Sequence, residues 1–172
     1  MRSEFAESQA QVVNCDFRKT LWGMTKAEVK HAEKAYPLSE NETYITYKDR
    51  IMGLDATVGF HFADDSLIEA CYAFREYYQD RDLYLRQYER IKLILTRMHG
   101  RPIIDRDLSS PCEEDGCCAG PVSEADDNMF IVEWLTCRSI IRLLFVSNKS
   151  CSELGVLHIC KDDGSAFKMN PN

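Results

Sequence analysis

Long apolar runs are missing from this chain of 172 residues. None reaches the roughly 20 residues that a membrane-spanning helix needs, so we expect no transmembrane segment. Residues 1–8 also lack the apolar core of a signal peptide. The stretch Arg2-Ser3-Glu4-Phe5 is one that two adjacent cloning sites could encode. Residues 1–5 are therefore interpreted as a cloning scar that stands in place of a natural leader.

Sequence motifs of catalysis and of cofactor binding are also lacking. There is no Gly-x-Ser-x-Gly elbow, no phosphate-binding loop and no Cys-x2-Cys zinc pair. Asp162-Asp163-Gly164 lacks the other ligands of a calcium loop, and Asp64-Asp65 is typical of a turn. The histidines are scattered and are interpreted as structural or solvated: His31, His61, His99 and His158. The sequence thus predicts a protein that is not an enzyme and holds no metal or cofactor.

The charge balance bears on the class of partner. The formal net charge is -7, which argues against nucleic acid and against an anionic membrane surface, since both need a basic patch. An acidic surface could suit a basic protein partner, although acidity alone mostly reflects solubility. Hydrophobic content of 45% and charged content of 28% predict one globular domain.

The cysteine content is even and high for a cytosolic chain. The eight cysteines are Cys15, Cys71, Cys112, Cys117, Cys118, Cys137, Cys151 and Cys160. Disulfides in an oxidising compartment explain this number better than a metal site does, so we expect a periplasmic or secreted protein. The alternative is a thiol-redox or metal-responsive protein that uses Cys112, Cys117 and Cys118.

Residue patterns predict two helices and six strands. A Thr25/Glu28 capping box begins a helix over residues 25–36, which Pro37 ends. A second helix carries a continuous apolar stripe and ends before Gly100. Its stripe consists of Tyr84, Tyr88, Ile91, Leu95 and Met98. Alternating or β-branched runs predict strands at residues 43–48, 54–62, 68–74, 130–136, 139–146 and 154–160. Residues 101–128 are predicted to be a long acidic connection.

The predicted order gives an α+β fold of two αβββ halves, with both helices packed on one face of an antiparallel sheet. Residues 1–16 form an N-terminal arm, 17–163 a single domain and 164–172 a tail. The internal duplication divides the domain into 17–100 and 101–163, or begins its second half with the helix near residue 80. Apolar residues on both faces of the 139–146 strand predict that it is covered on both sides.

Hairpin geometry narrows the disulfide pairings. A turn at 148–152 would place Ser147 opposite Glu153 and Cys160 opposite Ile140, so that Cys137 and Cys160 lie at one end of the sheet. A disulfide needs Cα atoms about 4.4–6.8 Å apart, which favours Cys137–Cys160. Cys151 would join a cysteine of the acidic connection: Cys112, Cys117 or Cys118. Cys15–Cys71 is the remaining pair.

The stretch Phe17-(x4)-Trp22-Gly23-Met24-Thr25-Lys26-Ala27-Glu28-Val29 resembles a group of bacterial envelope proteins. That group has a Trp-Gly-Met-Ser/Thr helix start, a Tyr-rich strand, a Gly turn, a Phe-x-Phe hairpin and a second helix ending near Gly-x-Pro. The matching pieces here are Tyr44 to Tyr47, Gly53, Phe60-His61-Phe62 and Gly100-Arg101-Pro102. The helix-then-sheet order is also similar to the beta-lactamase inhibitor protein and to the small lipoprotein of the outer-membrane assembly machine. Because Val12-Val13-Asn14-Cys15 is a poor lipobox, lipidation of Cys15 is not expected.

The resemblance implies a binding role, since both of those folds belong to non-catalytic binders. We therefore expect a periplasmic or secreted interaction module, an inhibitor or assembly factor, whose partner is another protein. The sequence does not decide its oligomeric state. A first-half cluster of tyrosines could mark an interface, but packing in the core and sheet is favoured because Tyr72, Tyr84 and Tyr88 lie on predicted inner faces. The cluster consists of Tyr44, Tyr47, Tyr72, Tyr77, Tyr78, Tyr84 and Tyr88.

Overall fold

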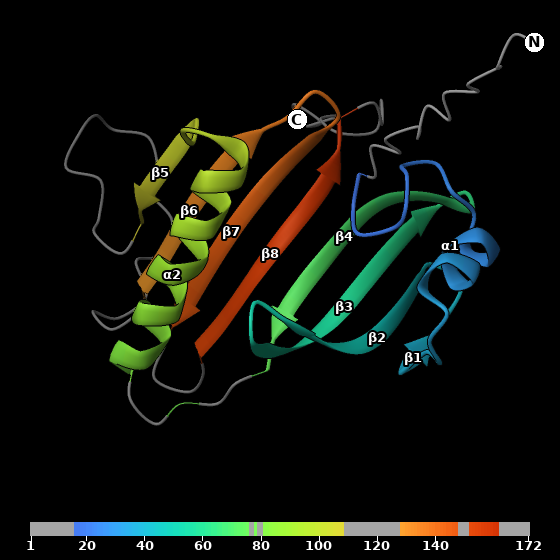
Figure 1. Cartoon of the computed structure of the whole chain (residues 1–172), viewed down its shortest axis with the longest axis horizontal. Coiled ribbons are helices and arrows are strands. Elements are labelled where there is room, and N and C mark those ends of the chain that lie inside the picture. Colours follow the sequence, from blue (N-terminus) through green and yellow to red (C-terminus); the bar gives the residue numbers. More distant parts are fainter. Residues whose placement is uncertain (1–15, 76–77, 79–80, 109–127, 148–151, 162–172) are drawn as a thin grey trace, which may run out of the picture.

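The computed structural model describes residues 16–75, 78, 81–108, 128–147 and 152–161. Their helices and strands, in chain order, are α1 (Lys26–Glu33), β1 (Ser39–Glu40), β2 (Tyr44–Ile51), β3 (Leu54–Ala63), β4 (Ser66–Phe74), α2 (Arg81–His99), β5 (Ile104–Asp107), β6 (Asn128–Leu135), β7 (Ser139–Ser147) and β8 (Ser152–Cys160). Figure 1 shows one broad twisted sheet with both helices on the near side.

The strands form a single antiparallel sheet with the order β1-β2-β3-β4-β8-β7-β6-β5. The predicted α+β class is confirmed. The last strand, β8, returns to the centre and pairs with β4, where Glu69 lies opposite Ile159 and Ala73 opposite Gly155. The centre of the sheet is therefore built from segments far apart in the sequence.

All six predicted strands are present, but β1 and β5 were not predicted. Among the described elements, each helix is therefore followed by four strands instead of three. Strand β5 lies inside the predicted long connection and reads Ile-Asp-Arg-Asp. Its only apolar residue, Ile104, gives no alternating pattern to detect. Strand β1 has only two residues, which is too short for any periodicity.

The first helix begins as predicted and ends early. The Thr25 side chain accepts from the amide of Glu28, and the Glu28 carboxylate accepts from the amide of Thr25, so the capping box is confirmed. The helix ends at Lys34, whose φ of 55° is left-handed. Two residues, Ala35 and Tyr36, lie between Lys34 and Pro37, so the proline is not what stops the helix.

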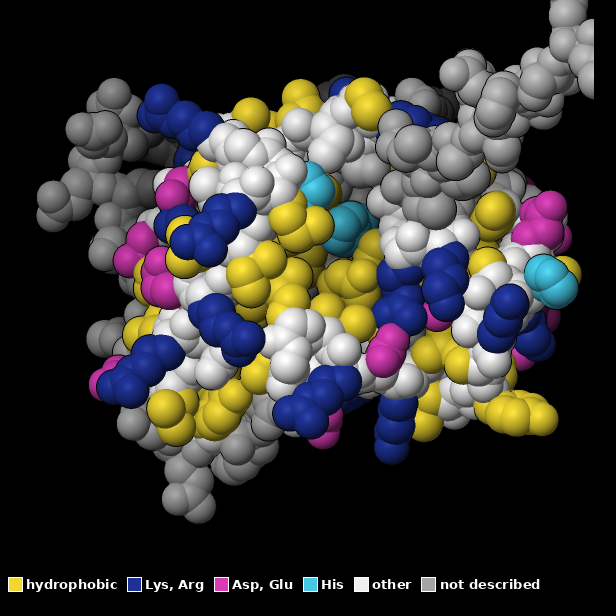
Figure 2. Space-filling view, viewed as in Figure 1, with side chains coloured by type: hydrophobic (Ala, Val, Ile, Leu, Met, Phe, Trp, Pro, Cys, Tyr) yellow, Lys and Arg dark blue, Asp and Glu magenta, His cyan; other side chains and the backbone are white. Residues whose placement is uncertain are grey.

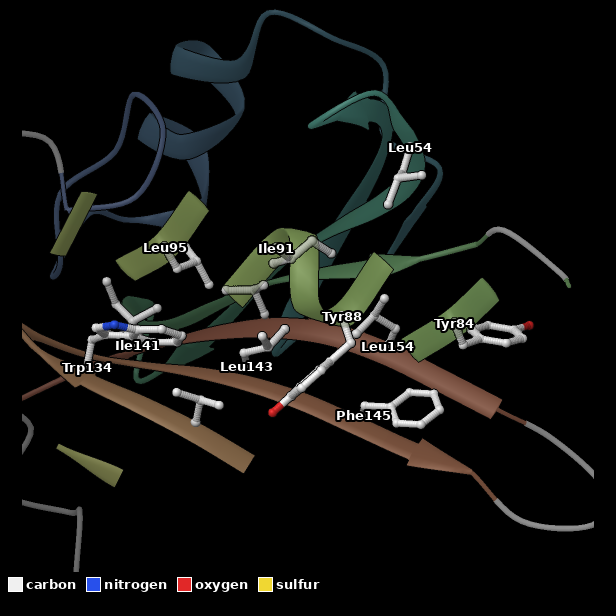
Figure 3. Packing of buried hydrophobic residues seen from close by; sticks show 12 residues of the cluster. Leu54, Tyr84, Tyr88, Ile91, Leu95, Trp134, Ile141, Leu143, Phe145 and Leu154 are labelled. Carbon is white, nitrogen blue, oxygen red and sulfur yellow. The ribbon is translucent and has the colours of Figure 1, made fainter. Parts of the chain in front are cut away.

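The second helix buries most of its predicted stripe. Tyr84, Tyr88, Ile91 and Leu95 are at most 6% exposed, whereas Met98 is 65% exposed and does not belong to the core. The helix ends where predicted, because Gly100 has a φ of 82° and its amide donates to the Thr96 carbonyl. Figure 3 shows the stripe packed on β7 and β8.

Two buried clusters occupy the same face of the sheet, which we call the inner face. One lies beneath α2 and includes Leu54 and Val156. The other joins α1 and the loop before it to β2 and β3, and includes Val29, Val58 and Cys160. Leu54 and Val58 share one face of β3, and Val156 and Cys160 share one face of β8, because side chains two or four residues apart along a strand point the same way. Both helices therefore cover one face, as predicted. Neither described helix is long and apolar enough to cross a membrane.

Candidate functional site

The opposite side of the sheet, the outer face, is unusually apolar over β6, β7 and β8. Its apolar residues there are Met129, Ile131, Leu135, Ile140, Leu144, Val146, Leu157 and Ile159. Leu135 is 49% exposed, Val146 38% and Met129 37%. A solvated face of an antiparallel sheet normally carries polar residues in alternation with the core. An exposed apolar patch of this kind usually marks a binding surface.

Strand register joins these residues into one patch. Ile131 lies opposite Leu144, and Leu135 lies opposite Ile140. Ile140 in turn lies opposite Ile159 on the next strand. The prediction that the 139–146 strand is covered on both sides is wrong for the described part of the chain, because both described helices pack on the inner face. The outer side chains of β7 are apolar without a described element above them.

One ion pair lies within the patch. Arg142 of β7 donates from Nε to Oε1 of Glu133 on β6 at 2.5 Å, and the two residues are direct cross-strand partners. The side chain of Glu133 is 9% exposed and that of Arg142 is 32% exposed. The pair is thus partly desolvated and fixed in orientation, and it gives an otherwise apolar surface a polar feature that a partner could match.

A cysteine borders the patch on β4. Cys71 lies opposite Leu157 of β8 and opposite Gly59 of β3. A Cβ atom at Gly59 would come within 2.9 Å of Cys71 Sγ. The absence of a side chain at Gly59 therefore makes space for this thiol. Burial raises the pKa of Cys71, which makes its thiol a poor nucleophile at neutral pH.

The four histidines do not gather in one site, but His99 and His158 are close enough to interact electrostatically. His31 and His61 are exposed. His158 lies on the inner face, with its ring centroid 4.9 Å from that of Phe17 and 6.1 Å from that of Tyr72. Burial, with a smaller contribution from His99, lowers the pKa of His158 to about 4.

The remaining polar candidates are structural too. Asp64 and Asp65 both have positive φ in the β3–β4 turn, as predicted for turn residues. In the part of the chain that the structure describes, no three His, Cys, Asp or Glu side chains gather where they could hold a metal ion.

The predicted disulfide register is off by one residue. Ser147 lies opposite Ser152, and Cys160 opposite Ser139, because the hairpin turn is one residue shorter than predicted. The predicted Cys137–Cys160 bond is not present, since both are free thiols, with Cys137 exposed and Cys160 buried. Cys71 is also free, so it is not joined to Cys15. Cys15, Cys112, Cys117, Cys118 and Cys151 lie outside the described residues.

The tyrosines are mainly packing residues. Tyr47, Tyr84 and Tyr88 are buried, and Tyr72 packs against both core clusters. Among the described tyrosines on strands, only Tyr44 is exposed, with 40% of its surface accessible. Tyr77 lies outside the described residues.

Sequence reasoning did not identify the outer face as a site. The signal was present in the apolar residues at alternate positions 140, 144 and 146, which were attributed to burial on both sides. The Trp22 motif, by contrast, is structural, because the Trp22 indole is buried and donates to Ser139 on β7. Comparison with models of protein families, with curated proteins and with solved structures finds no match for this chain.

Proposed function

We propose that this protein is a non-catalytic interaction module that binds another protein through the apolar outer face of β6, β7 and β8. The observation that carries the proposal is the exposure of apolar side chains on the adjacent strands β6 and β7, led by Leu135 at 49% and Val146 at 38%, next to the partly buried Leu157 and Ile159 of β8. Ordered β-strands hold these side chains in place, so that binding them does not require a large loss of conformational entropy.

A protein partner fits this face better than other macromolecules do. The patch is largely apolar, and its ion pair joins Glu133 to Arg142, whereas nucleic acid needs many unpaired cations. The net charge of -7 opposes an anionic membrane. A central apolar area with a few oriented polar groups is the usual composition of a protein–protein interface.

The role as an inhibitor or assembly factor in the periplasm or outside the cell extends this proposal. It is supported by the resemblance of the Phe17–Val29 stretch to envelope proteins and by the eight cysteines. The repeated order of one helix and its strands supports an origin by internal duplication. A duplicated fold would offer a helix-covered face for stability and leave the other face for binding.

Site-specific photocrosslinking tests the proposal. A benzophenone amino acid placed at Leu135 should capture a discrete protein adduct in the organism that makes this chain. The matched control is the same amino acid at Leu93, which is 52% exposed on α2 but lies on the other side of the sheet. The double change Leu135→Gln/Val146→Gln should suppress capture from a benzophenone at Leu144, while Leu38→Gln/Leu93→Gln should not.

Two results would contradict the proposal. One is that positions 135 and 93 yield the same adducts, which would indicate non-specific contact. The other is that no protein adduct forms at position 135 under conditions in which the chain is folded and expressed at its natural level.

A further inference from the structure

The inner face carries a second surface, a groove between α2 and the loop of residues 16–24. Helix α2 packs against β6 and β8, and Val29 of α1 packs over the β2–β3 half. Neither helix covers the central strand β4, where Tyr72 stays partly exposed while touching both clusters. Figure 2 shows this region as a hollow lined by hydrophobic side chains, with Lys and Arg side chains along its sides.

Two contacts fix which side of α2 faces the groove. Arg90 donates from Nη2 to the Met52 carbonyl in the β2–β3 turn at 2.9 Å, so this side of the helix looks toward the first half of the chain. Lys92 points the other way and pairs with Asp105 on the edge strand β5 at 2.8 Å. Positions between Arg90 and the buried stripe therefore form the groove wall.

Three of the four side chains in that wall are apolar. Helical spacing places Leu83, Gln87, Ile94 and Met98 in one line next to Arg90. Leu83 is 36% exposed and Met98 is 65% exposed. Exposed methionine is a flexible, polarizable side chain suited to binding an aromatic or aliphatic group. The wall thus offers a partner an apolar contact beside Tyr72.

A row of arginines runs along the solvent edge of the wall. Arg86, Arg90 and Arg97 lie one or two turns apart on the same side of α2, and all three are exposed. None of these three arginines belongs to an ion pair among the described residues. Arg90 donates instead to the Met52 carbonyl and to Gln87 Oε1. Arg18, across the groove, does form ion pairs, one with Glu33 and one with Asp49. The two carboxylates leave no positive excess around Arg18, so the unpaired positive charges beside the groove lie on α2.

We infer that this groove binds an acidic segment of a partner protein, with the carboxylates on Arg90 and Arg97 and an apolar side chain against Ile94, Met98 and Tyr72. Guanidinium groups bind carboxylates in a bidentate geometry, and charge complementarity sets the choice of partner more than its affinity. This second interface goes beyond the outer-face proposal and does not depend on it. Duplex nucleic acid is disfavoured, because the row is narrow and the whole chain carries a net charge of -7.

Three polymers serve as probes: a random copolymer of glutamate and tyrosine, poly-glutamate, and a short DNA duplex. Calorimetry at low salt should show binding of the copolymer, weaker binding of poly-glutamate because it lacks the apolar group, and no saturable binding of DNA. Raising the ionic strength should weaken the copolymer complex, since exposed charges are screened.

Variants locate the site. Arg97→Gln should weaken copolymer binding about tenfold, the loss expected for one charge-assisted contact, and Met98→Gln should remove the preference for the copolymer over poly-glutamate. Arg106→Gln is the matched control, because Arg106 is an exposed arginine on the outer side of β5, opposite Ile131 of β6. Both test positions are exposed, so the variants should unfold at the wild-type midpoint.

The inference is overturned if the copolymer fails to bind, if DNA binds more tightly than the copolymer, or if Arg106→Gln weakens binding as much as Arg97→Gln does. The outer-face variant Leu135→Gln/Val146→Gln should bind the copolymer as the wild type does. Loss of binding in that variant alone would place the acidic segment on the outer face, which would contradict the groove without contradicting the outer-face interface.

Discussion

The indole Nε1 of Trp22 donates a hydrogen bond to Oγ of Ser139, 2.9 Å away and 117 positions along the chain. Both residues are buried. The bond ties the loop before α1 to the start of β7, and so connects the first helix with the strands that close the sheet. The tryptophan of the Trp-Gly-Met stretch is thus explained by packing within this chain.

Ser139→Ala should lower the free energy of unfolding by about 1–3 kcal/mol, because it leaves the buried indole N–H without an acceptor. Urea denaturation measures this change. Ser39→Ala is the control, since Ser39 is exposed on β1 and should change stability by less than about 0.5 kcal/mol. Equal losses in the two variants would show that the Trp22 bond contributes nothing to stability.

Leu95→Ala should lower the free energy of unfolding by about 2–5 kcal/mol. Leu95 is 2% exposed on the buried side of α2, so its truncation leaves a cavity. Leu93→Ala makes the same chemical change at a position that is 52% exposed, so a loss below about 0.5 kcal/mol is expected. Thermal or urea unfolding measures the stability of both variants. Arg90 is unsuitable as a control because its side chain donates to the Met52 carbonyl. Similar losses at positions 93 and 95 would mean that the buried side of α2 is wrongly assigned.

The buried His158 predicts a specific dependence of stability on pH. Its pKa in the folded protein is lowered from 6.5 to about 4, first by burial. Below pH 6.5 the unfolded chain therefore binds a proton that the folded chain does not, and stability is lost as the pH falls toward 4. The slope approaches about 1.4 kcal/mol per pH unit for one such group.

Unfolding measured between pH 6.5 and 5 restricts the signal to histidines, because carboxylates titrate mainly below that range. Burial also lowers the pKa of His99, so His99 adds to the same slope. His158→Gln should reduce the slope to the part that His99 contributes, and His61→Gln should leave the slope unchanged because His61 is exposed. If the wild type and His158→Gln show parallel pH profiles, the burial of His158 is not what sets the acid sensitivity.

The thiols should differ in reactivity. Cys137 is exposed, whereas Cys160 is buried and Cys71 half-buried, and burial raises the pKa of Cys71. Iodoacetamide should therefore modify Cys137 in the folded protein, and Cys71 and Cys160 only after unfolding. Peptide mapping reports the three sites separately. A peptide in which Cys137 and Cys160 are joined would instead establish the disulfide that hairpin geometry predicts, and would contradict the free thiols of the structure.

Local sequence patterns were sufficient to predict most of the secondary structure. The Thr25/Glu28 box, the buried stripe of α2 and the alternation in β3 and β4 depend on neighbours within a few residues, so the sequence reveals them directly. The edge strands β1 and β5 escaped detection because a short polar strand is stabilised by its partner in the sheet and not by its own residues.

The order of the strands, their register and the two exposed surfaces depend on three-dimensional packing. Apolar residues on both sides of β7 predict that each face is covered. They do not indicate whether a helix of this chain or a partner protein covers it. Likewise, no periodicity could show that β8 returns to pair with β4, that Cys160 faces Ser139, or that Arg90 reaches Met52 across the groove. Those relationships join distant segments, so they exist only once the chain has closed its sheet, and both proposed binding surfaces depend on them.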